Sequence, residues 1–259
     1  MEQNTVVRNY ACQDNLNTRV NFHQKYHTSK ELWEEWLLKQ YEIANGSKVL
    51  EIGCGTGYQW DNQLYRFGGE TKFVFSDISP AMVDGVKNKF HAYPNVDVIQ
   101  MDANDIPFEK DSLDVVIANH MLYHIDNVDG VLKSVSSVLK TGGKLYAATN
   151  GESSMSELWA ILRKLGIERK YCKHSTFSLE NGGELLRKYF RKVEMREFVD
   201  SDYVDNLEDL YYYMESLPSV QDSDVPFEKG RVLEYLESIS DKNGGILLPK
   251  KVGLFVGTK

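Results

Sequence analysis

Cysteine is scarce in this chain, and its positions suit neither a metal centre nor a disulfide framework. Only three cysteines occur in 259 residues, Cys12, Cys54 and Cys172, and no CxxC or Cys/His spacing joins them. Structural zinc sites and disulfide scaffolds use closely spaced or even-numbered cysteines. We therefore expect no metal, no disulfide and a reducing, cytoplasmic environment.

Long apolar runs and excess positive charge are also absent. No window approaches the roughly 20 apolar residues that a membrane helix needs, and the N-terminal segment lacks the apolar core of a signal peptide. With 30 basic and 38 acidic residues, the net charge of −8 gives no general attraction to a phosphate backbone. We expect a soluble protein that acts on neither membranes nor nucleic acid.

What the sequence does contain is a regular alternation of apolar strands with helix-length segments. The apolar runs are KVLEI, KFVFS, VDVIQM, LDVVIAN and KLYAAT, all between Lys48 and Thr149. Turn signals such as Gly68-Gly69 and Thr141-Gly142-Gly143 stand just before strands. This rhythm is typical of a doubly wound α/β fold with a mostly parallel sheet.

After Thr149 the pattern changes. Residues 154–166 and 179–190 are expected to be helical, KVEMREFV to form a sixth strand and KKVGLFVGTK a seventh. Residues 202–245 between these strands are rich in tyrosine and acids and too long for a simple loop. We predict that they form a helical cap over the substrate site, with packing on the flank of the sheet as the alternative.

The first 44 residues are expected to form a helical arm. Residues 28–41 begin with Thr28 and Glu31 in the arrangement of a capping box and continue with apolar residues at helical spacing. The preceding segment contains Tyr10, Arg19, His23 and Tyr26, and an arm placed there can close over a ligand as a lid. A disordered N-terminus is the alternative. The expected division is an arm at 1–44, a core at 45–201 and 246–259, and a cap insert at 202–245.

The most informative motif follows the first strand. Glu51 precedes a glycine loop made of Gly53, Cys54, Gly55, Thr56 and Gly57. A dinucleotide-binding fingerprint would need glycine or alanine at position 58, which is Tyr58. Glycines let the chain turn sharply and bring backbone N–H groups against a ligand.

This pattern resembles the first motif of class I S-adenosylmethionine-dependent methyltransferases, of the type 11 and type 25 kind. Later segments resemble the family's next motifs in order: Asp77 ends the second strand, Asp102-Ala103 ends the third, and LDVVIANHMLYHI and LKTGGKLYAAT follow. The resemblance covers residues 49–149. It implies a Rossmann-like sheet of seven strands, mostly parallel with an antiparallel last strand. A dehydrogenase would leave the last two motifs unexplained.

The resemblance also implies a cofactor, S-adenosyl-L-methionine, which leaves as S-adenosyl-L-homocysteine. The residues that it assigns to the cofactor are Glu51, Gly53, Cys54, Gly55, Gly57, Asp77, Ile78, Met82, Asp102, Ala103, Asn119 and His120. Of these, Asp77 would bind the ribose hydroxyls, Ile78 and Met82 would line one face of the adenine, and Asp102 with Ala103 would bind the adenine amino group.

Two histidines are candidates for catalysis. His120 and His124 stand four residues apart after the fourth strand and would share one face of a helix beginning there. We expect His124 to act as a general base or to orient the substrate, and His120 to line the sulfur end of the cofactor. The alternative is that both only pack.

The sequence therefore predicts methyl transfer to an oxygen or nitrogen of a small molecule by in-line displacement. No Asn/Asp-Pro-Pro-Tyr/Phe tetrapeptide follows the fourth strand, which weakens the case for many nucleic-acid and glutamine methyltransferases. Methylation of RNA or protein, and cofactor binding without catalysis, stay open as alternatives. So does a homodimer.

Overall fold

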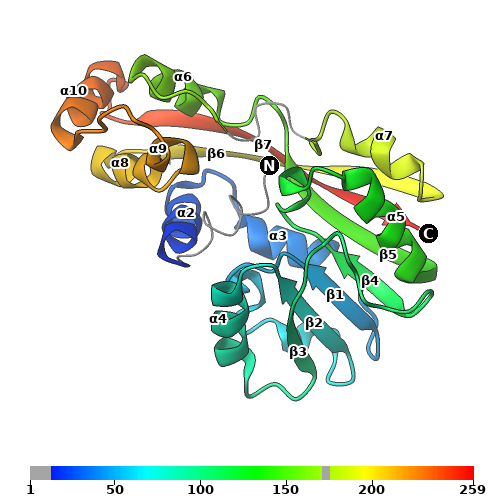
Figure 1. The fold of residues 1–259 in the computed structure, drawn as a ribbon. Coiled ribbons are helices and arrows are strands. Elements are labelled where there is room, and N and C mark those ends of the chain that lie inside the picture. The colour runs from blue at the N-terminus through cyan, green and yellow to red at the C-terminus, as the bar shows by residue number, and fades with distance from the viewer. Residues whose placement is uncertain (1–12, 171–175) are drawn as a thin grey trace.

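A seven-stranded β-sheet organises the chain, whose computed structural model describes residues 13–170 and 176–259 (Figure 1). Tyr10, Cys12 and Cys172 lie outside the described residues. The strands are β1 (Lys48–Ile52), β2 (Lys72–Asp77), β3 (Val96–Gln100), β4 (Leu113–Ile117), β5 (Leu139–Asn150), β6 (Lys192–Val204) and β7 (Ile246–Thr258). Their order is β3-β2-β1-β4-β5-β7-β6.

The pairing confirms the predicted fold class. Strands β1 to β5 pair in parallel, whereas β7 runs antiparallel to both β5 and β6. Parallel strands need crossover connections, and helices within these connections, together with one that precedes β1, cover both faces of the sheet. These helices are α3 (Trp33–Gln40), α4 (Pro80–Phe90), α5 (Val128–Val138) and α7 (Gly182–Arg187).

Successive side chains of the strands pack into two different cores, one on each face of the sheet. In β1, Leu50 packs in the core that contains Leu132 of α5, whereas its neighbour Val49 packs in the core that contains Leu37 of α3. All four side chains are almost completely buried. A strand buried on both faces in this way reads as the continuous apolar run seen in the sequence.

Strands β6 and β7 extend beyond the rest of the sheet as a long hairpin (Figure 1). Pairing between β5 and β7 stops at Asn150 and Val252, whereas β6 and β7 remain paired as far as Val204 and Ile246. The extension carries the helices α6 (Ser156–Lys164), α8 (Leu207–Glu215), α9 (Pro218–Gln221) and α10 (Lys229–Ile239). A third core holds them together with the N-terminal helix α2 (Gln13–Tyr26), whose Phe22 and Tyr26 it includes.

The segment after α2 corrects one local prediction. Helix α3 begins at Trp33, and the residue before it makes no side-chain cap, so the predicted capping box of Thr28 and Glu31 is wrong. Instead, the backbone N–H of Thr28 donates to the carbonyl of Ser201 at 2.8 Å and to the carboxylate of Asp200 at 3.0 Å. Pairing with β6 therefore replaces the first turn of the expected helix.

Within the described part of the chain, no helix is long and apolar enough to cross a membrane.

Candidate active site

The ends of β1, β2, β3 and β4 open onto a cavity of about 660 Å³. Carboxyl ends of parallel strands meet at one edge of the sheet, which is where open α/β sheets bind ligands. The volume lies in the usual range for small-molecule sites. The opposite wall is formed by α2, by the segment leading into α6 and by the β6–β7 hairpin.

Two glycines of the loop lie so close to neighbouring side chains that a larger residue would be crowded there. Gly53 has a φ of 68°, and a Cβ placed on it would lie 2.8 Å from the Cβ of Met121. A Cβ on Gly55 would lie 3.1 Å from Leu16 of α2, which covers the loop. The Cys54 N–H donates to the Ser76 carbonyl at 2.9 Å, so the loop leaves β1 while still paired with β2.

Asp77 fixes this loop to the start of α4. Its Oδ2 accepts the Gly55 N–H and its Oδ1 accepts the Ser79 N–H, each at 2.9 Å. Burial raises the pKa of Asp77, and the bonds to Ser79 and Gly55 oppose this effect. The N–H of Ile78 is a third backbone donor to Asp77; because a carboxylate offers about four acceptor positions and Asp77 lines the cavity, it can still accept a hydrogen bond from a ligand.

A buried polar network begins at Glu51. Gln59 donates to its Oε1 at 3.0 Å, and the indole N–H of Trp60 donates to its Oε2 at 2.6 Å. The network continues through Asn119, whose amide nitrogen donates to Gln59 Oε1 at 3.0 Å and to the hydroxyl of Tyr41 at 2.7 Å. Burial raises the pKa of Glu51 to about 8; the Trp60 bond opposes this and the charge of Asp77 adds to it.

The third strand end also reaches the cavity. Asp102 and Ala103 line it, as does Ile78 from the end of β2. Asp102 accepts the backbone and side-chain N–H groups of Asn104 at 2.9 Å, which holds the loop after β3.

The two candidate histidines line the cavity but do not share a helical face. His120 has a φ of 52°, and its N–H donates to the Ala148 carbonyl at 2.9 Å, so the backbone there still follows the sheet. His124 ends a single 3₁₀ turn, η3 (Leu122–His124), and α5 starts only at Val128. The expected helical start is therefore wrong. Burial lowers the pKa of both imidazoles to about 4.

Two of the residues assigned to the cofactor lie outside the cavity wall. Met82 is completely buried, and the space above Gly57 is filled by Phe90, whose ring atom would lie 3.0 Å from an added Cβ. The remaining sequence-predicted residues line the cavity together: Glu51, Gly53, Cys54, Gly55, Asp77, Ile78, Asp102, Ala103, Asn119, His120 and His124. Cys54 is a free, buried thiol.

Several residues that complete the site were not predicted, because they belong to no sequence motif. Gln59 and Tyr41 hold Asn119, yet neither belongs to a motif. On the opposite wall, aromatic and apolar side chains gather without a sequence pattern: Trp33, Met155, Leu158, Trp159, Phe198 and Leu217. Of the Tyr211–Tyr213 run, only Tyr213 lines the cavity, while Tyr212 is 46% exposed.

The cavity wall contains buried polar atoms whose missing hydrogen bonds a ligand could supply. The amide oxygen of Asn119 and the hydroxyl of Thr56 are buried and have no hydrogen-bond partner among the described residues, although both side chains belong to the wall. Buried polar atoms are normally paired, because an unpaired one costs about 1–3 kcal/mol. An acceptor and a hydroxyl beside the glycine loop suit an ammonium and a carboxylate, such as those at the amino-acid end of S-adenosylmethionine.

Comparison with known proteins agrees with this geometry. Residues 49–143 match a family described as a methyltransferase domain. Demethylmenaquinone methyltransferase from Staphylococcus aureus is 27% identical over 205 residues, which are 71% of this chain and 83% of that protein. The chain is a class I S-adenosylmethionine-dependent methyltransferase.

Solved structures share the fold of this methyltransferase. A putative methyltransferase from Bacillus halodurans is 17% identical with a TM-score of 0.63, covering 88% of this chain and 98% of its own. The YcgJ protein of Bacillus subtilis is 16% identical with a TM-score of 0.62, covering 87% and 97%. At these identities the likeness concerns the fold alone. Among the described residues of the methyltransferase, no cluster of side chains can hold a metal ion.

The raised pKa of Glu51 predicts a specific pH dependence of stability. The carboxyl has an ordinary pKa of 4.5 when unfolded and about 8 when folded. Its contribution is complete below pH 4.5 and is lost as the pH rises towards 8, because the folded state then retains a proton that the unfolded state releases. Relative to Glu51→Gln, which cannot ionise, the wild type should lose about 1.4 kcal/mol per pH unit in this window.

Urea unfolding of the cofactor-free protein at several pH values measures this loss. Exposed Glu109 provides the control, since Glu109→Gln should show the pH dependence of the wild type. Parallel curves for wild type and Glu51→Gln would contradict the assignment.

Proposed function

We propose that this methyltransferase moves the methyl group of S-adenosylmethionine to an oxygen or nitrogen of a small molecule with an apolar body. The observation that carries the proposal is the two-sided cavity. Polar strand ends form one wall and aromatic side chains the other, within a volume suited to compact ligands. The similar S. aureus protein is named for a small molecule, demethylmenaquinone. The cytoplasm stays the expected compartment, and a homodimer stays open.

In this proposal the polar wall holds the cofactor. Asn119 Oδ1, Glu51 and the loop residues Gly53, Cys54 and Gly55 would bind its amino-acid end, and Asp77 would accept hydrogen bonds from the ribose hydroxyls. Ile78 would pack on the adenine, and Asp102 with the backbone of Ala103 would bind its amino group. His120 would line the sulfur end. The bound cofactor supplies a methyl group already activated on a sulfonium, and the chain aligns the acceptor with the S–CH3 bond.

Asp77 allows a direct test of the cofactor site. Asp77→Asn places an amide N–H where the carboxylate accepts, so the hydrogen bonds to the ribose and the loop are weakened. Because a hydrogen bond to a charged group contributes about 1.5–3 kcal/mol, S-adenosylhomocysteine should bind roughly 10- to 100-fold more weakly by calorimetry. Asp97→Asn, an exposed change on β3, should leave the affinity as it is. Affinities within threefold for both variants would remove Asp77 from the site.

The substrate class is tested by following the methyl group. With radiolabelled S-adenosylmethionine, the purified protein should methylate members of a panel of phenols, quinols and amines. Label in total RNA or protein would instead support a macromolecular substrate. Binding of S-adenosylhomocysteine with no transfer to any acceptor would indicate a protein that binds the cofactor without catalysis.

The position of α2 supports the proposal that the N-terminal arm is a lid. Leu16 covers the glycine loop, so the cofactor cannot pass on that side unless α2 moves. S-adenosylhomocysteine should therefore slow trypsin cleavage after Arg19 and Lys25. Cleavage after exposed Lys242, at the far end of the hairpin, serves as the internal control. Equal rates at Arg19 and Lys25 with and without ligand would count against a lid.

The segment between β6 and β7, residues 205–245, is part of the same proposal. It contributes Tyr213 and Leu217 to the cavity wall, while its other helices pack on the third core. We propose that these two residues help to select the acceptor.

A further inference from the structure

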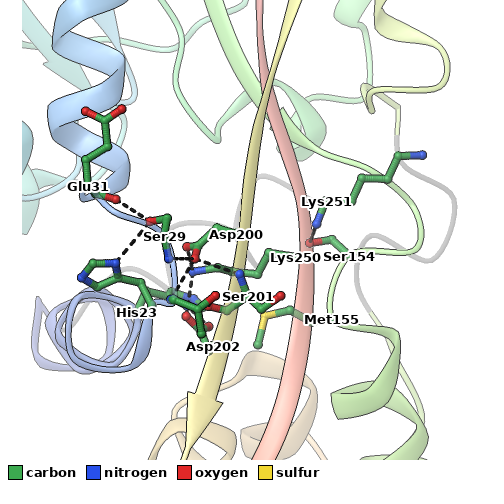
Figure 2. Close-up of polar contacts among 12 residues, drawn as sticks. His23, Ser29, Glu31, Ser154, Met155, Asp200, Ser201, Asp202, Lys250 and Lys251 are labelled. Carbon is green, nitrogen blue, oxygen red and sulfur yellow. Dashed lines mark hydrogen bonds and ion pairs between the residues drawn. The ribbon is translucent and has the colours of Figure 1, made fainter.

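A second cluster of charged side chains lies on the hairpin, away from the strand ends that hold the cofactor. Asp200 and Asp202 are two residues apart on β6, so they point to the same face, and Lys250 is paired directly with Asp200 on β7. The Lys250 ammonium lies 2.6 Å from Asp200 Oδ2 and 2.7 Å from Asp202 Oδ1 (Figure 2). Asp202 is completely buried.

The remaining oxygen of Asp202 holds a histidine of the N-terminal arm. His23 Nδ1 of α2 lies 2.7 Å from Asp202 Oδ2. A carboxylate only accepts hydrogen bonds, so this contact places the proton of a neutral His23 on Nδ1 and leaves a lone pair on Nε2. Bonds from Thr28 and Ser29 to Asp200 tie the segment after α2 to the same strand and so fix the position of the helix.

The free face of His23 belongs to the cavity. Its side chain is 34% exposed and lines the wall shared with Trp33 and Phe198. Its charge contributes, after burial, to the lowered pKa of His120, so the two imidazoles are close enough to interact. His23 therefore shares the cavity with the strand ends that the proposed function assigns to the cofactor.

A hydroxyl already occupies the hydrogen-bonding position at His23 Nε2. The Tyr213 hydroxyl lies 3.3 Å from this nitrogen and 3.6 Å from the sulfur of Met155. Burial raises the pKa of the Tyr213 phenol, which therefore stays a neutral donor. In the proposed step an acceptor O–H or N–H takes the place of the Tyr213 hydroxyl at Nε2, and the sulfur of Met155 remains as a partner for that hydroxyl.

We propose that His23, positioned by Asp202, takes the proton of the methyl acceptor. This inference rests on the proposed function. As the bond from the acceptor oxygen or nitrogen to the methyl carbon forms, the C–S bond breaks and its electron pair stays on sulfur, which becomes a neutral thioether. The proton of the acceptor passes to His23 Nε2, and the imidazolium later releases it to water.

Asp202 makes His23 better suited to this step than the histidines on the other wall. The carboxylate beside Nδ1 fixes the tautomer and the orientation of the His23 ring, so that Nε2 is the nitrogen able to accept a proton. His120 and His124, by contrast, have their pKa lowered to about 4 by burial, so an imidazolium is costly at either position. In this assignment of roles, His124 orients the acceptor and His120 lines the sulfur end of the proposed cofactor.

The test compares variants on an acceptor that the wild type methylates. His23→Gln keeps a donor for Asp202 but cannot take the proton, so kcat should fall about 10²- to 10⁴-fold. KM and the affinity for S-adenosylhomocysteine should stay within about threefold. The control is His91→Gln at the exposed end of α4, where the ring nitrogen Nδ1 hydrogen-bonds the Asn88 carbonyl, and it should keep full activity. A kcat of His23→Gln within threefold of the wild type would overturn the proposal.

A rescue experiment distinguishes proton transfer by His23 from a purely structural role of that residue. If His23→Gln also loses cofactor binding, His23→Ala is assayed with added imidazole, which can enter the space left by the ring. Return of activity supports the proton-transfer role, and no return overturns it. In the His23→Ala background, Asp202→Asn should cause no further loss of kcat, because Asp202 acts through His23. An additive loss would overturn that part of the assignment.

The outcomes also separate this inference from the proposed function. A wild type that binds S-adenosylhomocysteine but methylates no acceptor removes both. A wild type that methylates an acceptor and is matched by His23→Gln removes only the role of His23.

Discussion

The pairing of β6 with β7 beyond the end of β5 is the constraint on which the rest of the site depends. It carries the backbone past the sheet edge and gives α6, α8 and α10 an apolar surface to pack on. It also presents the edge of β6 to the segment after α2, which pairs there through Thr28. Without this extension, the strand ends would lack the wall that faces them across the cavity.

Within the cavity, the two walls are stabilised in different ways. On the strand-end wall, Asp77 and Glu51 are held mainly by neutral donors, so burial dominates and the pKa of each is raised. On the hairpin wall, burial is also the largest single effect on Asp200 and opposes its ionisation, but Lys250 and the backbone N–H groups of Ser29 and Ser201 together outweigh it, so the pKa is lowered. A cationic cofactor fits the first wall, because it would supply the positive charge that the protein itself does not.

Much of the fold and about half of the site could be predicted from the sequence, because they depend on local order. The glycine loop, Asp77 and Asp102 each follow a strand directly, so strand periodicity is enough to bring them to one edge. Tertiary contacts decide the rest. His23 and Asp202 are 179 positions apart, and no spacing rule joins them. The helix expected at His120 failed because the backbone there continues to pair with β5, which hydrophobic pattern alone does not reveal.

The strand order has a consequence for synthesis on the ribosome. Strand β6 pairs with β7 and not with β5, although β6 is made first. Until β7 emerges, β6 and the tyrosine-rich helices that follow it have no sheet to join, and their apolar faces stay exposed to other chains and to chaperones. The nascent chain can complete its first five strands early, but the second wall of the cavity forms only after β7 has been made.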